Sequence, residues 1–403
     1  MSIEKNVPEI RFEGFKGQWS EFSLGELGSV ATNKRIFMHQ TSSIGEVPFF
    51  KIGTFGKEPQ LFISLDLFED YKKRFPFPNK GDLLFSVIGS IGRVVEYTGE
   101  NQYFQDSNIV WLKHDGTIVN SFLKQFYSIV EWSGLEGSTI KHLYNRNILE
   151  TKIKMPSPKE QTQIGNYFQK LDSLINQHQQ KHAKLSNIKK AMLEKMFPKQ
   201  GETIPEIRFK GFSGEWEESS LAEEAVVTTG YPFDSADFSE DGDLLVVTNG
   251  NIQNSSSAVD GKVGNRIASE KVTHLNQYKL NFGDILVTMD GSVGRTAKVI
   301  DRNQILAQRV GRLVARNDTE FLYQSLNTGA FLETMTTISH GGTIKHISLS
   351  EIGSYIVHVP KDLNEQAKIG AYLKNLDDLI ERHHKQITKL NNIKQACLSK
   401  MFV

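Results

Sequence analysis

The sequence has one cysteine, no excess of either charge and no long apolar run. Because Cys397 is the sole cysteine among 403 residues, an internal disulfide is excluded. No window approaches the roughly 18 apolar residues of a membrane span. The N-terminal residues MSIEKNVPEI also lack the apolar core of a signal peptide. These absences predict a soluble, cytoplasmic protein with no membrane partner.

The balance of charge limits what the chain can bind by itself. Lys and Arg number 47, and Asp and Glu also number 47. Proteins that bind nucleic acid alone usually carry a basic excess. Any DNA affinity of this chain is therefore expected to be local or shared with partners. The length is sufficient for two or more cores, so a single domain is disfavoured.

One long segment occurs twice, at residues 160–197 and 365–402, with about half of the aligned positions identical. In both copies the apolar residues recur at alternating spacings of four and three, which is typical of one stripe on an α-helix. No proline interrupts either copy, so each is predicted to be a single helix of roughly 57 Å. Matching stripes predict that the two helices pack together as a coiled coil.

Histidines interrupt both stripes. His178 and His182 lie four residues apart, and His383 follows at the position equivalent to His178. This spacing could start a metal site, but no carboxylate pair or Cys cluster completes a ligand set. We therefore interpret His178 and His383 as polar residues that fix the register of the helix pair, with no bound metal. Cys397 lies on the second stripe and is expected to be a small apolar filler.

A second duplication precedes each helix. The segments 8–24 and 205–221, here called the lead segments, share a pattern of Pro, alternating apolar residues, Gly and Trp that predicts a strand and a turn. Mixed β character follows in both halves. Strands are predicted at Pro48–Ile52, Leu83–Ile88, Ile109–Leu112, Leu244–Thr248, Ile285–Met289 and Val310–Val314. A helix is predicted from Asn120 to Trp132, capped by Asn120 and Ser121 and ended by Gly134, and another at Thr319–Leu326 after Asp318.

The whole chain is thus one module written twice. Pro156 and Pro360 end the β-rich parts just before the helices. Between the matching segments, residues 30–80 and 226–281 have almost nothing in common. Equal scaffolds with unequal inserts would suit a protein that reads two different targets.

A Gly-Ser-x-Gly-Arg turn follows a predicted strand in each half and contains Ser90 and Arg93, or Ser292 and Arg295. Its backbone N–H groups and hydroxyl could meet an anion, and its arginine could contact phosphate or guanine. The alternative is a tight β-turn with an arginine in solvent. A second shared motif, Thr-Ile-Lys-His, begins at Thr139 and Thr343 and could contact a DNA backbone or be an ordinary exposed loop.

Other polar side chains in the β-rich parts suit base edges, although each is a weak signal alone. Asn145 in the first half has such a side chain. The candidate DNA contacts are Ser90, Arg93, Asn108, Lys141, His142, Arg146, Asn249, Asn251, Ser292, Arg295, Gln308, Arg309, Lys345 and His346.

Catalytic motifs are missing. Neither Gly-Ser-x-Gly-Arg turn fits the phosphate-loop or Gly-x-Gly-x-x-Gly pattern, so a bound nucleotide cofactor is not expected. There is no Asn/Asp-Pro-Pro-Tyr methyltransferase motif, no nucleophile elbow and no repeated acid/base pair. The chain is therefore predicted to be non-catalytic.

The openings of the two helices carry a family resemblance. Pro158-Lys159-Glu160-Gln161 is followed by Ile164 and Leu171-Asp172, and Glu365-Gln366 is followed by Ile369 and Leu376-Asp377. With these motifs the chain resembles the specificity subunit of type I restriction-modification systems over its whole length. In the second copy Lys361-Asp362-Leu363-Asn364 replaces Ser157-Pro158-Lys159, so the geometry of that hinge is expected to differ.

The resemblance implies an α+β fold with two mixed, β-rich target-recognition domains separated by two long antiparallel helices that form a coiled-coil spacer. The implied domains are residues 1–157 and 201–361, and the helices are residues 158–200 and 362–403. Each domain would read one half of a split, asymmetric site in double-stranded DNA. Two such domains on a rigid rod would hold the half-sites at a fixed separation.

The resemblance also implies partners. Two modification subunits would bring S-adenosylmethionine and adenine methyltransferase chemistry, and two restriction subunits would bring ATP, Mg and cleavage, with no cofactor on this chain. The residues expected to pair the helices and to dock partners are Ile164, Phe168, Leu171, Ile175, His178, Leu185, Ile369, Leu373, Leu376, Ile380, His383 and Leu390. Two other classes stay open: a catalytic DNA enzyme, and a structural coiled-coil scaffold, which leaves the unlike inserts unexplained.

Overall fold

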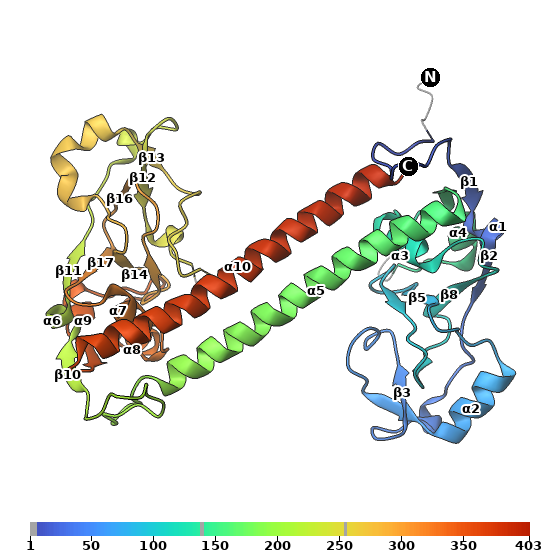
Figure 1. Ribbon diagram of the computed structural model, residues 1–403, viewed down its shortest axis with the longest axis horizontal. Helices are drawn as coiled ribbons and strands as arrows, with labels where there is room; N and C mark the ends of the chain where they lie inside the picture. The colour runs from blue at the N-terminus through green and yellow to red at the C-terminus, as the bar shows by residue number, and fades with distance from the viewer. Residues whose placement is uncertain (1–5, 138–140, 254–255) are drawn as a thin grey trace. The chain divides into compact units, whose positions relative to one another are not determined.

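The computed structural model describes residues 6–137, 141–253 and 256–403, and its contacts divide the chain into two compact units. Unit 1 comprises Met1–His178 together with Gln386–Val403, and unit 2 comprises Gln179–Lys385. Each unit therefore contains one β-rich domain and a stretch of both long helices (Figure 1).

The strands in the described part of unit 1 form three sheets. A four-stranded antiparallel sheet has the order β2-β8-β5-β6, a three-stranded sheet has the order β4-β3-β7, and β1 pairs with β9. Within the three-stranded sheet β3 pairs antiparallel with β4 and parallel with β7. The strands are β1 (Ser20–Ser23), β2 (Gly28–Ala31), β3 (Val47–Phe50), β4 (Leu61–Ile63), β5 (Leu83–Ser86), β6 (Val94–Glu96), β7 (Tyr103–Phe104), β8 (Ile109–His114) and β9 (Lys152–Met155). The helices are α1 (Leu24–Leu27), the 3₁₀ turn η1 (Met38–Gln40), α2 (Leu65–Arg74), α3 (Asn120–Ile129) and α4 (Asn145–Glu150).

Unit 2 repeats this arrangement. Its sheets have the orders β11-β17-β14-β15 and β13-β12-β16, and β10 pairs with β18. The strands are β10 (Glu217–Ser220), β11 (Ala225–Thr229), β12 (Leu244–Val247), β13 (Arg266–Ile267), β14 (Ile285–Thr288), β15 (Thr296–Lys298), β16 (Gln304–Leu306), β17 (Val310–Ala315) and β18 (Ile356–Val359). The helices are α6 (Leu221–Glu224), η2 (Ser235–Asp237), η3 (Asn249–Asn251), η4 (Ser269–Tyr278), α7 (Thr319–Leu326), α8 (Ala330–Ile338) and α9 (Leu349–Gly353).

The unlike inserts, residues 30–80 and 226–281, supply the same strands to the same sheets. In each unit the middle strand of the three-stranded sheet pairs antiparallel with the following strand and parallel with a later one. The inserts differ in their helices, because α2 is a ten-residue α-helix whereas η4 is a kinked 3₁₀ segment. Dissimilar sequences therefore build one scaffold, which leaves the side chains on it free to differ.

The predicted strands are confirmed to within two residues at each end, and α7 spans the predicted residues. Asp318 caps α7, because its carboxylate accepts a hydrogen bond from the Phe321 N–H at 2.7 Å. The prediction for α3 was wrong in its details. The helix ends at Ile129, well before Gly134, and no side chain caps its start.

The two long helices are α5 (Pro158–Lys195) and α10 (Leu363–Met401), which confirms the predicted pair. In unit 1, Lys394 bonds Asp172 at 2.7 Å, and Cys397 lies 3.5 Å from the Tyr167 hydroxyl. In unit 2, Lys189 bonds Asp377 at 2.5 Å. Because residue numbers rise along α5 as they fall along α10, the pairing is antiparallel in each unit.

Burial differs along the predicted apolar stripe. The stripe residues in the N-terminal part of each helix are enclosed by the domain and by the end of the other helix, with Phe168 and Leu373 fully buried. The roles in helix pairing and partner docking stay predictions. The buried members are Ile164, Phe168, Leu171, Ile175, Ile369, Leu373 and Leu376. The members that are only partly buried are His178, Leu185, Ile380, His383 and Leu390.

In unit 2, His182 of α5 contacts His384 of α10, with ring centroids 6.1 Å apart. The proposed role of His178 and His383 in setting the register stays a prediction. Cys397 is half-buried among apolar residues of unit 1, as expected for a filler.

The Glu-Gln opening of each long helix holds the lead segment against the start of that helix. Glu160 is 1 % exposed and accepts two hydrogen bonds from Arg11, both at 2.7 Å. Glu365 receives the same pair of bonds, both at 2.7 Å, from Arg208. The neighbouring Gln161 accepts from the Val119 N–H at 2.8 Å, so it satisfies the start of α3. We call the two ion pairs Arg11–Glu160 and Arg208–Glu365 the arginine clamps.

Glycine lets α10 lie close to the domain. A Cβ on Gly370 would come within 2.8 Å of the Phe321 backbone nitrogen, which is closer than real Cβ atoms approach. In unit 1, a Cβ on Gly165 would likewise come too close to Ser121. The repeated Glu-Gln-x-x-Ile-Gly therefore encodes a clamp, an apolar contact and a close helix approach.

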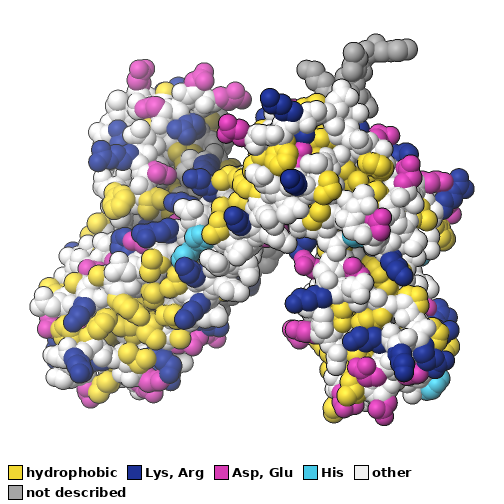
Figure 2. All heavy atoms as spheres, turned by 45° about the vertical axis from the view of Figure 1, so that its right-hand side comes forward, with side chains coloured by type: hydrophobic (Ala, Val, Ile, Leu, Met, Phe, Trp, Pro, Cys, Tyr) yellow, Lys and Arg dark blue, Asp and Glu magenta, His cyan; other side chains and the backbone are white. Residues whose placement is uncertain are grey.

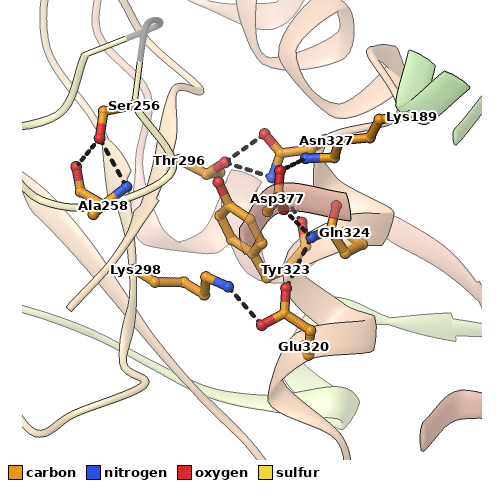
Figure 3. A network of polar contacts seen from close by, with 10 residues as sticks. All are labelled: Lys189, Ser256, Ala258, Thr296, Lys298, Glu320, Tyr323, Gln324, Asn327 and Asp377. Atoms are coloured by element: carbon orange, nitrogen blue, oxygen red, sulfur yellow. Dashed lines mark hydrogen bonds and ion pairs between the residues drawn. The ribbon is translucent and has the colours of Figure 1, made fainter. Parts of the chain in front are cut away.

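A polar network fixes the helix pair to the domain of unit 2 (Figure 3). Asp377 of α10 accepts from Gln324 of α7 at 2.8 Å as well as from Lys189 of α5. Lys298 of β15 bonds Glu320 at 2.5 Å and lies 4.5 Å from the ring centre of Tyr323. Burial, followed by the charges of Asp377 and Glu320, raises the pKa of Tyr323. One network thus joins both long helices to α7 and to the four-stranded sheet of unit 2.

Candidate nucleic-acid interface

The two Gly-Ser-x-Gly-Arg motifs form tight turns whose backbone groups are hydrogen-bonded by the hydroxyl at the end of the preceding strand. In unit 2 the Thr288 hydroxyl donates to the Ser292 carbonyl at 2.5 Å and accepts from the Arg295 N–H at 2.9 Å. In unit 1 Ser86 makes the same two contacts with Ser90 and Arg93. The inward-facing hydroxyl explains why a Ser or Thr ends the preceding strand, and it supports the β-turn interpretation.

The loops with the Lys-His motif lie beside these turns. The Leu143 N–H donates to the Val87 carbonyl at 2.8 Å, and the Ile347 N–H donates to the Met289 carbonyl at 2.9 Å. These bonds bring His142 and His346 next to their turns, while Lys141 and Lys345 are exposed. Thr139 and Ile140 lie outside the described residues.

In unit 2 the loops converge on one acid, Asp290. Its carboxylate accepts from the Arg309 guanidinium at 2.8 Å and contacts the His346 ring through Nδ1. Burial raises the pKa of Asp290, but the bonds from Arg309 and His346 outweigh it, and the net effect is a lowered pKa. In return, the Asp290 carboxylate raises the pKa of Arg309. We call Asp290, Arg309 and His346 the unit 2 triad.

The corresponding place in unit 1 carries different chemistry. Ile88 stands at the turn position of Asp290, and Asn108 precedes β8 as Arg309 precedes β17. The backbone is equivalent, because the Val87 N–H donates to the Asn108 carbonyl at 3.0 Å and the Met289 N–H donates to the Arg309 carbonyl at 3.3 Å. His142 lies at the position equivalent to that of His346, yet its Nδ1 is buried with no hydrogen-bond partner among the described residues.

Two further candidates in unit 2 lie near the triad. The Asn249 side-chain oxygen Oδ1 accepts from the Met289 N–H at 3.2 Å, and exposed Gln308 directly precedes Arg309. Asn251 is different, because it is buried and its amide is fully used. It accepts from the Thr248 N–H at 2.9 Å and donates to the carbonyls of Asp260 and Val263. Asn251 therefore holds a loop together and presents no edge to a base.

Three arginine candidates lie outside such a cluster. Arg93 donates to the Phe55 carbonyl at 3.0 Å and Arg146 pairs with Glu150 at 2.9 Å within α4. Arg295 lines a cavity of about 910 Å³ together with Lys298 and Asp377. Ser90 and Ser292 are exposed residues within the two Gly-Ser-x-Gly-Arg turns.

Sequence reasoning missed Asp290, the residue that organises the cluster. The signal was present in the alignment of the two turns, where Ile88 and Asp290 differ within otherwise matching segments. Differences at equivalent positions, rather than shared motifs, show where the surfaces of the two units carry different side chains.

Positive and negative side chains are both scattered over the visible face of the molecule (Figure 2), in keeping with the balanced composition. Within the described residues, no group of three or more His, Cys, Asp or Glu side chains is placed to hold a metal ion. No helix in the described part of the chain has the length and apolar character needed to cross a membrane.

Comparison with known proteins places this geometry in a family. The family model described as type I restriction modification DNA specificity domain matches residues 16–187 and 213–392, one match for each half. This family is one of non-catalytic specificity subunits whose DNA-recognition domains share a repeated architecture.

Individual relatives agree with that assignment. A putative type I restriction enzyme specificity subunit of Haemophilus influenzae is 50 % identical over 154 residues, which cover 38 % of this chain and 40 % of the relative. The MjaVIII specificity subunit of Methanocaldococcus jannaschii is 24 % identical over 80 % of this chain and 75 % of its own length.

A solved structure shares the fold. The S subunit of a type I restriction-modification system from M. genitalium has a TM-score of 0.64 at 17 % identity, covering 98 % of this chain and 99 % of that one. It confirms two β-rich domains with two long helices packed together. This chain therefore belongs to the family of type I restriction-modification DNA specificity subunits.

Proposed function

We propose that each unit reads one half of a bipartite, asymmetric site in double-stranded DNA and thereby directs adenine methylation and restriction. The observation that carries this proposal is the repeated scaffold with different side chains at equivalent positions. Asp290 and Arg309 in unit 2 stand where Ile88 and Asn108 stand in unit 1. Such a pair of surfaces would offer different hydrogen-bonding groups to base edges, as recognition of two unlike half-sites requires.

The recognition domains in this proposal are residues 1–157 and 201–361, joined by the helices 158–200 and 362–403. The helices act as a spacer, because α5 is one unbroken α-helix that contributes to both units. Rigid elements that carry two reading heads fix the separation of the half-sites.

Partner subunits complete the proposed machine. Two modification subunits would dock on the exposed face of the helix pair and carry S-adenosylmethionine, and two restriction subunits would supply ATP- and Mg-dependent cleavage in the cytoplasm. With 47 basic and 47 acidic residues, the chain needs partners to supply much of the phosphate neutralisation that governs DNA affinity.

The test is a genome-wide map of methylated adenines in cells that express the modification subunits with and without this chain. The proposal expects a split motif with two defined half-sites that disappears when the chain is removed. Persistence of the motif without the chain, or a continuous motif with it, would overturn the proposal.

One binding measurement and one methylation map separate the other two classes, a catalytic DNA enzyme and a structural scaffold. S-adenosylmethionine bound by the isolated chain would favour a catalytic DNA enzyme. A methylation motif that is indifferent to residues 226–281 would favour a structural scaffold, since these residues are the insert that most distinguishes unit 2.

A further inference from the structure

We infer that Asp290 is a positioning residue that aims Arg309 at a guanine in the half-site read by unit 2. This inference rests on the proposed function and names the residue and base class through which unit 2 would read. Arg309 sits in the turn before β17 with φ +66°, and its carbonyl accepts from the Met289 N–H at 3.3 Å. The backbone is therefore fixed, while the side chain is 62 % exposed.

The hydrogen bonds of Arg309 leave one edge of its guanidinium available. Nη1 of Arg309 donates a hydrogen bond to the Asp290 carboxylate at 2.8 Å. Among the described residues, no hydrogen-bond partner is present for Nε or Nη2 of Arg309. Two parallel N–H donors on one edge match the O6 and N7 acceptors of guanine in the major groove.

Asp290 is itself held from the other side. Its Oδ2 receives Arg309, and its Oδ1 contacts Nδ1 of His346. The Gly291 N–H also donates to the Lys345 carbonyl at 2.8 Å, which fixes the turn relative to the loop of His346. An anchored guanidinium has less rotamer freedom to lose when it binds, so fixing it favours recognition of one geometry.

Unit 1 cannot form this arrangement, because Ile88 replaces the acid and Asn108 replaces the arginine. Its His142 keeps the position of His346 but has a buried Nδ1 with no hydrogen-bond partner among the described residues. The triad is thus specific to unit 2, and its effect on the DNA motif should be confined to one half-site.

A phosphate could use the same donor edge as guanine, so the experiment must separate the two. The full-length chain is expressed with its modification subunits as wild type, Asp290→Asn, Asp290→Glu, Arg309→Lys and the double variant Asp290→Asn/Arg309→Lys. Methylated adenines are then mapped genome-wide. Lys345→Ala is the matched control, because Lys345 is an exposed cation in the adjoining loop.

We expect Asp290→Asn and Arg309→Lys to lower the preference for guanine about tenfold at the same single position of one half-site. The other half-site should stay unchanged in every variant. Asp290→Glu, which retains the carboxylate, should keep part of the preference, and the double variant should be no more relaxed than Arg309→Lys. Lys345→Ala should lower methylation evenly without changing the motif.

Unchanged base preference in either single variant, Asp290→Asn or Arg309→Lys, would overturn the inference. An even loss over all sites in Arg309→Lys would also overturn it, because that is the behaviour of a phosphate contact. If Asp290→Asn abolishes methylation altogether, Arg309→Lys decides by the same two criteria. A wild-type chain that directs no split motif would instead refute the proposed function, and an intact opposite half-site shows that the variant is folded.

Discussion

Breaking the arginine clamp of unit 1 should loosen that unit and leave unit 2 intact. Glu160 is 1 % exposed and holds Arg11 through two bonds of 2.7 Å. In Glu160→Gln the guanidinium would face a neutral amide inside the same contact. Removing one partner of a buried ion pair costs about 3 to 5 kcal/mol. We expect about 3 kcal/mol, the lower end of that range, because the Arg11 side chain is 14 % exposed and also donates to the Gly17 carbonyl.

Hydrogen exchange followed by mass spectrometry measures this effect region by region. A loss of about 3 kcal/mol corresponds to roughly 150-fold faster exchange of amides that open with the clamp. The amides concerned are those of the lead segment 8–24 and of the first turns of α5. Glu365→Gln breaks the clamp with Arg208 and should produce the reciprocal pattern in unit 2.

A surface pair provides the baseline for this experiment. Arg146 and Glu150 are 84 % and 61 % exposed, so Glu150→Gln should change stability by no more than about 0.5 kcal/mol. Exchange in Glu160→Gln that is no faster than in Glu150→Gln would refute the role given to the clamp. Equal acceleration in both units would refute its confinement to unit 1.

Two further predictions concern the long helices. Inserting seven residues after His182 in α5 and seven after His384 in α10, where the helices face each other in unit 2, should lengthen the pair by about 10 Å and the DNA spacer by about three base pairs. A methylation map with an unchanged spacer would show that the helices do not set the distance between the half-sites. Leu373→Ala removes a fully buried side chain of unit 2 and should cost about 3 kcal/mol in urea unfolding, whereas the partly buried Leu390→Ala should cost about 1 kcal/mol. Equal losses would contradict the burial assigned to the two positions.

The helices and the duplication could be predicted because their signals are local and repeated. An apolar stripe without proline over residues 160–197 indicates a long helix whatever surrounds it. The role of the stripe could not be predicted as well, because a helix residue facing a partner helix and one facing a domain look alike in sequence. Phe168 and Leu373 prove to be core residues of their units.

The start of α3 shows a second limit. Asn120 and Ser121 suit a helix cap, yet the Val119 N–H is satisfied by Gln161, which is 42 residues away. The Asn120 side chain instead donates to the Gly81 carbonyl at 2.8 Å. Tertiary contacts of this kind replace local capping rules, and one sequence does not reveal them.

The DNA contacts chosen from the sequence stay predictions, but the structure shows how their residues group. The Lys-His loops lie beside the shared turns, and Arg309 belongs to a cluster that its sequence position did not reveal. Asn251 was chosen for its side chain, and its burial could not be foreseen from composition. Asp290 was overlooked because an acid is an unexpected residue on a surface proposed to face DNA unless its partners, Arg309 and His346, are known.

The central claim is that each unit reads its own half-site. The most direct measurement replaces residues 226–281 with the corresponding insert of another family member and maps methylated adenines genome-wide. One half-site should change while the other half-site and the spacer length are kept. A motif in which both half-sites change, or neither does, would contradict the central claim.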